Sequence, residues 1–318
     1  MVALRGAVSS TAALDFRRAL RRHARFKLEQ RAQLADIYAE LVAPRKRGSA
    51  ARADAAMLGD AWLGPAIRAG LLQPIPDALA SRWWAGLSPR WRRLLRRDAN
   101  GRLSDHGDVW AAPHRWGCTL VAARKDKLLR WGGRPIRDWG DLLQPRLRGR
   151  LAMVDSPREL VAVALATLGL PLNATAADVL MAGVGVDGLR ARVDELRQQV
   201  RVFSSREHTR ALAAGDVWAV VGWSGDLLPI AERSANVTLS APVSGVPLWA
   251  DLWTVPAGAS GGSQGRGPSP LLPAWLEFGL QPARAERRRG MLEFLAPLDE
   301  DTAALHWSVL HPEQRDSL

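Results

Sequence analysis

The residue with the clearest spacing for covalent chemistry is Ser224, in the sequence Gly222-Trp223-Ser224-Gly225. A serine nucleophile elbow has the pattern Gly-x-Ser-x-Gly, which presents the hydroxyl for acyl transfer. This chain lacks the second glycine, and no histidine follows at a persuasive position. Asp105-His106 and His208 could supply acid–base groups, but lone histidines are more often surface or core residues. Because no pattern demands catalysis, we expect a protein that is not an enzyme.

Metal and nucleotide chemistry are not indicated either. The sequence contains no Gly-x-x-x-x-Gly-Lys-Ser/Thr loop for phosphates and no His-Glu-x-x-His pair. Its six histidines are scattered without metal-ligand spacing. Its one cysteine, Cys118, excludes a disulfide framework and a cysteine zinc site. We therefore expect no cofactor.

Binding of anions is the next chemistry to weigh, because the chain has 44 Lys+Arg against 32 Asp+Glu, a formal net charge of +12. Such an excess suggests nucleic acid or an anionic membrane surface as a partner. The densest basic segment is 82–97, where tryptophans and arginines interleave and could stack on a single strand. The alternative is a helical face whose tryptophans pack inward while its arginines stay in water. We favour this alternative and expect no stable nucleic-acid partner.

The elements that position these residues are short apolar strands alternating with helices. This alternation predicts an α/β fold with a largely parallel sheet. The expected strands are 2–8, 26–30, 54–58, 119–123, 150–154, 217–222, 237–240 and 252–255. The expected helices are 10–23, 34–42, 62–69, 139–143, 155–168, 189–200, 271–280, 286–295 and 302–310.

Two such series in 318 residues predict two lobes, with the chain passing between them around 111–117 and again around 251–256. We assign 1–113 plus 254–283 to lobe 1 and 114–253 to lobe 2. The Gly/Ser/Pro-rich segment 258–270 is expected to be a flexible insertion loop. Helices within 284–318 are expected to pack back across the lobes.

Position alone singles out a few residues in the first lobe. Ligand crevices of parallel sheets lie beyond the carboxyl ends of the strands. Ser9 and Ser10 follow the first expected strand, and Gly59 and Asp60 follow the third. The longest apolar stretch of the chain, 160–172, is too short to cross a bilayer.

Five segments, in this order, resemble a known family. They are Trp110-Ala-Ala-Pro-His-Arg-Trp-Gly117, Trp139-Gly-Asp-Leu-Leu with Leu147-Arg-Gly-Arg-Leu151, Asp155-Ser-Pro-Arg-Glu159, Ala214-Gly-Asp-Val-Trp-Ala-Val-Val-Gly-Trp-Ser224 and Leu248-Trp-Ala-Asp-Leu-Trp253. Their order and spacing are similar to those of the periplasmic spermidine/putrescine-binding proteins of ABC importers. The likeness is clearest from about 110 to 256 and suggests a divergent member. It implies a type II, venus-flytrap fold of two α/β lobes with two interlobe crossings.

The resemblance also implies a ligand site. In that family a polyamine lies in the cleft between the lobes, with carboxylates on its ammonium ends and aromatic rings around its methylene stem. The matching positions here are Glu159, Trp223, Trp249 and Asp251. Ring faces, charge-assisted hydrogen bonds and buried methylenes offset the cost of association only when both carboxylates and both rings contribute.

Other positions of the family site are altered. The second carboxylate of the helix start falls on Ser156, unless Asp155 substitutes for it. The aromatic–hydroxyl pair of the first strand falls near Ser9, where the ring is lost. The serine–tyrosine pair after the third strand falls beside Asp60 and Trp62.

Alternatives to these roles remain open. Glu159 would also favour its own helix N-terminus, Asp251 could cap a turn, and the tryptophans could be core residues. Arg115, Arg158 and Arg206 could instead clamp a carboxylate or a sulfate-like anion.

The resemblance finally implies partners and a compartment. It predicts a monomeric solute-binding protein that closes about a hinge on a polyamine-like ligand and hands it to the membrane permease of an ABC importer. The implied location is the periplasm, or a plastid if the source is an alga. The chain opens at Met1, and the following Val2-Ala-Leu-Arg-Gly-Ala-Val8 is typical of a strand and not of a signal core. We therefore expect either a trimmed mature form or a start placed too late.

Overall fold

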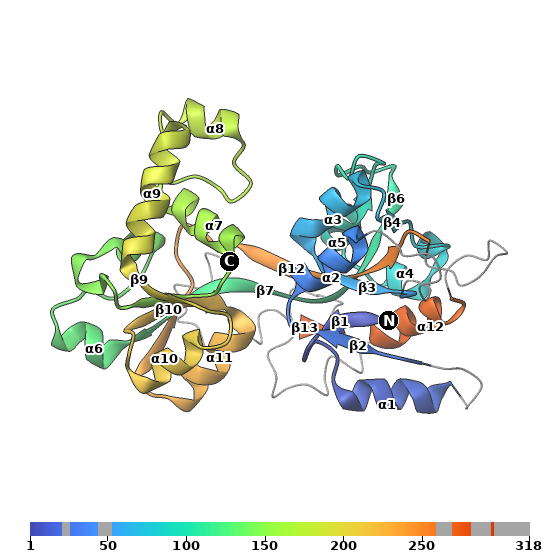
Figure 1. Cartoon of the computed structure of the whole chain (residues 1–318), viewed down its shortest axis with the longest axis horizontal. Coiled ribbons are helices and arrows are strands. Elements are labelled where there is room, and N and C mark those ends of the chain that lie inside the picture. The colour runs from blue at the N-terminus through green and yellow to red at the C-terminus, as the bar shows by residue number, and fades with distance from the viewer. Residues whose placement is uncertain (21–25, 44–52, 259–268, 281–293, 296–318) are drawn as a thin grey trace. The chain divides into compact units, whose positions relative to one another are not determined.

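The computed structural model describes residues 1–20, 26–43, 53–258, 269–280 and 294–295 (Figure 1). These residues form two compact units. Unit 1 contains 1–116 and 249–280 with 294–295, and unit 2 contains 117–248. The expected helix at 302–310, most of the one at 286–295 and most of the loop at 258–270 lie outside the described residues. Residues 294–295 are a short strand and not a helix.

The helices and strands alternate along the chain, as the sequence predicts. In unit 1 they are β1 (Val2–Leu4), α1 (Ser10–Ala19), β2 (Glu29–Arg31), α2 (Leu34–Val42), β3 (Ala56–Gly59), α3 (Asp60–Arg68), β4 (Leu72–Gln73), η1 (Ala78–Ala80), α4 (Arg82–Ala85), α5 (Pro89–Leu95), β5 (Arg96–Arg97), β6 (Asp108–Val109), α12 (Leu271–Gly279) and β13 (Phe294–Leu295). In unit 2 they are α6 (Lys125–Arg130), η2 (Trp139–Leu143), η3 (Pro145–Leu147), β8 (Leu151–Met153), α7 (Pro157–Thr167), α8 (Ala176–Met181), α9 (Gly185–Gln199), β9 (Val200–Phe203), α10 (His208–Ala214), β10 (Ala219–Trp223), α11 (Ser224–Arg233) and β11 (Val237–Ser240). The chain enters unit 2 within β7 (Ala111–Arg124) and leaves it at the start of β12 (Leu248–Pro256).

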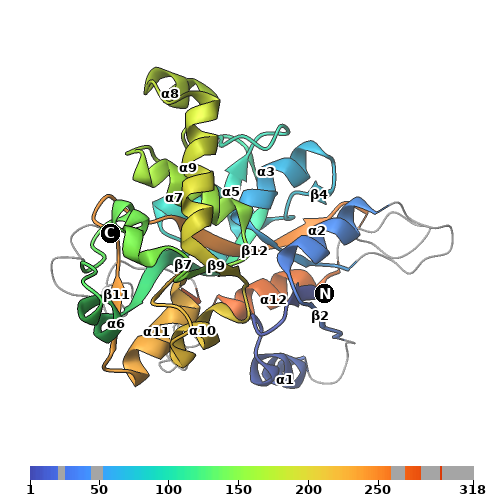
Figure 2. The same cartoon turned by 60° about the vertical axis from the view of Figure 1, so that its left-hand side comes forward.

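Each unit contains parallel strands bordered by antiparallel ones. In unit 1 the strand order is β2-β1-β3-β12, with β1 parallel to β2 and β3, and with β12 antiparallel to β3. In unit 2 the order is β7-β10-β8-β9, where β10, β8 and β9 are parallel and β10 runs antiparallel to β7. Helices α7 and α9 cover one face of the unit 2 strands, and α10 and α11 cover the other (Figures 1 and 2).

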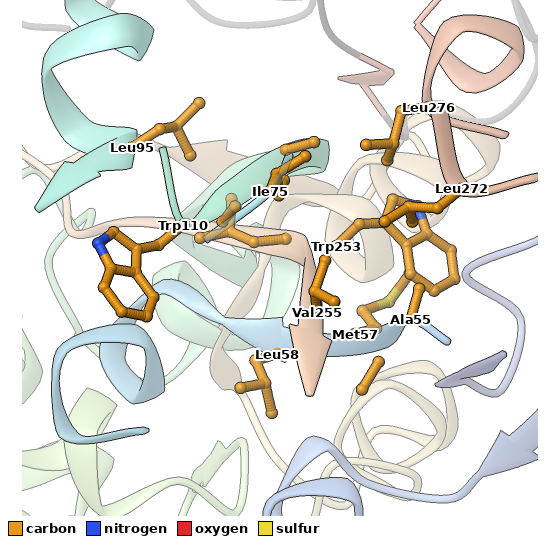
Figure 3. Packing of buried hydrophobic residues seen from close by; sticks show 14 of the residues in the cluster. Ala55, Met57, Leu58, Ile75, Leu95, Trp110, Trp253, Val255, Leu272 and Leu276 are labelled. Atoms are coloured by element: carbon orange, nitrogen blue, oxygen red, sulfur yellow. The ribbon is translucent and has the colours of Figure 1, made fainter. Parts of the chain in front are cut away.

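The core of unit 1 is rich in aromatic rings. Trp275 of α12 packs edge-on against Trp253 of β12, with ring centroids 5.7 Å apart, and against Phe16 of α1 at 5.0 Å. Figure 3 shows Trp253 beside Leu272 and Leu276, the apolar side of α12. This packing holds β12, the strand that carries the Trp249–Asp251 pair, firmly in unit 1.

Several expected strands have different bounds. The expected strand 2–8 ends at Leu4, because Gly6 adopts a left-handed φ of +82° and Ala7 N–H turns back to the Leu4 carbonyl at 3.0 Å. The expected strand 119–123 is part of a 14-residue strand, and the segment 111–117, expected as a connection, belongs to it. The expected strand 252–255 likewise begins at Leu248.

The basic segment 82–97 does not form one helix. It forms α4 and α5, which are separated at Gly86, and then β5. Trp83, Trp84 and Trp91 are buried, so the inward packing of the tryptophans is confirmed. The Arg92 guanidinium donates to the carbonyls of Trp84 and Ala85. Among the described residues, no helix combines the length and the apolar composition that crossing a bilayer requires.

Candidate ligand-binding site

The segments that follow β1 and β3 contain the unit 1 residues that were expected at the ligand crevice from their position in the chain. Ser9 caps α1, and its Oγ accepts a hydrogen bond from Ala12 N–H at 3.1 Å. Asp60 is the first residue of α3, where a negative charge is favourable. Its Oδ1 accepts a hydrogen bond from Ala250 N–H at 3.2 Å. Asp60 is thereby fixed beside the start of β12.

Trp62 presents an exposed ring in the first turns of α3. It is 37% exposed, and its ring lies 4.4 Å from that of Tyr38 of α2, tilted by 33°. The two amphipathic rings lie side by side, and Trp62 is two residues from Asp60 in the chain. The sequence pattern does not mark Tyr38 as a site residue, because its ring contact with Trp62 joins two different helices, α2 and α3.

Trp249 and Asp251 of β12 share one partner, Arg115 of β7. Asp251 lies opposite Gly59 in the β12–β3 pairing and is only 4% exposed. Its Oδ2 accepts a hydrogen bond from Arg115 Nε at 2.5 Å. The Arg115 Cζ lies 5.7 Å from the Trp249 ring centroid, within the range of a cation–π contact. A carboxylate and a ring two residues apart on one strand point to the same side, and here both contact one cation.

The ionisation of Asp251 depends on opposing effects. Burial raises the pKa of this carboxyl above its ordinary value, the Arg115 guanidinium acts in the opposite direction, and nearby Asp60 adds to the increase. The net direction is upward. A cation beside Asp251 therefore favours the charged form of this carboxyl.

The corresponding unit 2 carboxylate is Glu159, in the first turn of α7. Ser156 caps this helix and accepts a hydrogen bond from Glu159 N–H. The Glu159 side chain is buried and accepts a 2.6 Å hydrogen bond from the Thr119 hydroxyl. Arg158 Nη1 lies 3.6 Å from Glu159 Oε1. Asp155 is exposed, and its backbone N–H donates to Ser205 Oγ.

Trp223 ends β10 directly opposite Thr119 of β7 and is half-buried. Thr119 thus lies between Trp223, its neighbour across the strands, and Glu159, its hydrogen-bond partner. In unit 2 the structure brings Glu159 and Trp223 together at Thr119, and Ser156 caps the helix that carries Glu159. In unit 1 it brings Asp60, Trp249 and Asp251 together, whereas Ser9 contacts its own helix and Trp62 contacts Tyr38.

The groups weighed for other chemistry have structural roles. Ser224 is 1% exposed, and its Oγ accepts a hydrogen bond from Cys118 N–H at 3.2 Å. His208 is buried, with Nε2 3.6 Å from Asp226 Oδ2. Arg206 is exposed. Within the described part of the chain, no three His, Cys, Asp or Glu residues are grouped so as to hold a metal ion.

Solved structures with the same architecture identify the fold. A lipoprotein of Treponema pallidum, Tp0655 (TpPotD), has a TM-score of 0.69 at 19% identity, covering 90% of this chain and 81% of that one. The spermidine/putrescine substrate-binding protein PotD of Streptococcus pneumoniae has a TM-score of 0.66 at 15% identity, covering 100% and 98%. The fold is therefore that of the two-lobed, type II periplasmic binding proteins, as expected.

The chain belongs to the bacterial extracellular solute-binding protein family, whose model matches residues 22–265. It is 28% identical over 206 residues to the putrescine-binding periplasmic protein PotF of Escherichia coli K12, covering 61% of this chain and 52% of that protein. It is 30% identical over 203 residues to a putrescine/agmatine-binding protein of Pseudomonas aeruginosa, covering 58% and 50%. The chain thus spans about half the length of these relatives. Proteins of this class bind solutes for ABC transporters and are not enzymes.

Proposed function

We propose that this protein captures a small polyamine-like cation in the periplasm and delivers it to the permease of an ABC importer. The observation that carries the proposal is the shared contact of Trp249 and Asp251 with one cationic group, the Arg115 guanidinium. A ring face and a buried carboxylate set up to hold one cation suit an ammonium group as well.

The unit 2 cluster supports the same ligand chemistry. Glu159 supplies a second buried carboxylate, and Trp223 supplies a second ring. Each ring contributes about 0.5–2 kcal/mol beside a desolvated cation. A hydrogen bond to a charged group contributes about 1.5–3 kcal/mol. The names of the relatives, which bind putrescine, agmatine or spermidine, point to the same class of ligand.

The alternative ligand, a small anion, has less support. Arg115 is hydrogen-bonded to Asp251, and Arg158 lies beside Glu159. The positive charge of each arginine is thus balanced by a carboxylate of the protein itself. An anion would have to compete with that carboxylate.

Titration calorimetry with putrescine and spermidine tests the proposal. We expect the wild type to bind at least one of these amines with a micromolar dissociation constant. Asp251→Asn and Trp249→Ala should each weaken binding about tenfold or more. Asp187→Asn is the matched control, because the Asp187 side chain is 96% exposed on α9, and it should bind like the wild type. Absence of a heat of binding with both amines would contradict the proposal.

A further inference from the structure

The place that a ligand cation would take in unit 1 is held by a side chain of the protein. Arg115 Nε contacts the Asp251 carboxylate, and the Arg115 guanidinium lies over the Trp249 ring. The Arg115 side chain is 14% exposed and that of Asp251 is 5% exposed, so the pair is largely withdrawn from water. An ammonium group that approached the same carboxylate and ring would meet this guanidinium.

A second carboxylate also acts on Asp251. The charge of Asp60 acts to raise the pKa of both Asp251 and Arg97. The Arg115 guanidinium acts on the pKa of Asp251 in the opposite direction and donates a hydrogen bond to its carboxylate. Arg115 therefore balances the charge of Asp251 before a ligand arrives.

We propose that Arg115 is the residue that determines specificity in this site, because it competes with the ligand's ammonium for Asp251 and Trp249 and so weakens the binding of multiply charged polyamines. This inference rests on the proposed function. Binding of a ligand ammonium in place of the Arg115 guanidinium gains little free energy. The hydrogen bond and the ring contact that the ammonium forms replace similar contacts that Arg115 loses. Without Arg115, the buried Asp251 would lack its counter-ion, and an incoming ammonium would supply it.

Removal of this arginine from the site should therefore tighten polyamine binding. The Arg115→Gln variant should bind putrescine at least tenfold more tightly than the wild type in titration calorimetry. The double variant Arg115→Gln/Asp251→Asn removes both charges together and should lose that gain. Arg124→Gln is the matched control, because Arg124 also pairs with a carboxylate, Asp126, but on the surface of unit 2. It should bind like the wild type.

If Arg115→Gln does not fold alone, it is prepared with methylguanidinium, a small cation that reproduces the missing group. Putrescine should then displace methylguanidinium from the variant. The dissociation constant for putrescine, obtained after the midpoint is corrected for the methylguanidinium concentration, should be at least tenfold below the wild-type value.

Each outcome bears on one of the two proposals. Binding by Arg115→Gln that is equal to or weaker than wild-type binding, with a native circular dichroism spectrum, overturns the inference and leaves the proposed function intact. Failure of putrescine to displace methylguanidinium, when the wild type binds putrescine, does the same. Absence of polyamine binding in the wild type and in every variant overturns the proposed function, and the inference with it.

Discussion

The Thr119 hydroxyl donates a 2.6 Å hydrogen bond to Oε2 of Glu159, and both side chains are buried. Thr119 lies in β7, and Glu159 lies in the first turn of α7. The helix cap at Ser156 fixes the backbone of Glu159, and the strand fixes its carboxylate. The Glu159 side chain therefore points toward β7, and its carboxylate does not serve only its own helix N-terminus.

Replacing Thr119 by valine should destabilise the protein measurably. The change leaves the buried Glu159 carboxylate without one hydrogen bond, which costs about 1–3 kcal/mol. Thr119→Ser keeps the hydroxyl and should cost less. Urea unfolding followed by circular dichroism measures both changes. An undiminished stability of Thr119→Val would show that the hydrogen bond contributes nothing.

A close backbone approach predicts the effect of one glycine substitution. Gly101 has a φ of +74°, and a Cβ there would lie 2.3 Å from the Gly64 carbonyl oxygen of α3. Gly101→Ala should therefore combine the cost of a left-handed residue, about 1–2 kcal/mol, with that of overpacking, about 1–3 kcal/mol.

Gly6→Ala is the control for that substitution. Gly6 has a φ of +82° but open space around the added Cβ, so only the conformational cost should appear. Scanning calorimetry should show a clearly larger drop in the unfolding temperature for Gly101→Ala. The same drop in both variants would contradict the close approach.

The single thiol should be unreactive in the folded protein. Cys118 is fully buried, and burial raises the pKa of its thiol far above the ordinary value. Ellman's reagent at pH 8 should not label the native protein, whereas one thiol per chain should react after unfolding in guanidinium chloride. Prompt labelling of the native protein would show that β7 opens around Cys118.

Glu29 should make stability depend on acidic pH. Lys27 and then Arg31 hydrogen-bond its carboxylate and lower its pKa from 4.5 to about 2. Since the folded pKa is depressed, this ionised group stabilises the fold above about pH 4.5 and loses its contribution as the pH falls to about 2. The effect is small, because the side chain is 39% exposed.

The variant Glu29→Gln isolates that contribution. Its unfolding temperature should lie slightly below that of the wild type at pH 6, and the difference should disappear near pH 2. A difference that stays constant over this range would mean that the carboxylate's charge is irrelevant to stability.

Local sequence patterns were sufficient to predict the class of fold. The strands around 56–59, 151–153 and 219–223 are short apolar runs, and each is followed by a helix with a polar residue at its start, namely Asp60, Ser156 or Ser224. These elements can be predicted from the sequence because hydrophobic periodicity and helix capping depend only on neighbouring residues. The order of five motifs led to the solute-binding family, which the match over residues 22–265 confirms.

The contacts of the candidate site residues, in contrast, depend on how distant parts of the chain pair. Arg115 and Asp251 are 136 residues apart, and nothing in the sequence indicates which of many arginines meets this aspartate. The order of strands brings them together, since β12 lies between β3 and β7. The same pairing extends β12 through the charged Asp251, where the apolar pattern alone predicted a strand only from residue 252. Long-range pairing, which no local rule encodes, thus sets the partner of each carboxylate.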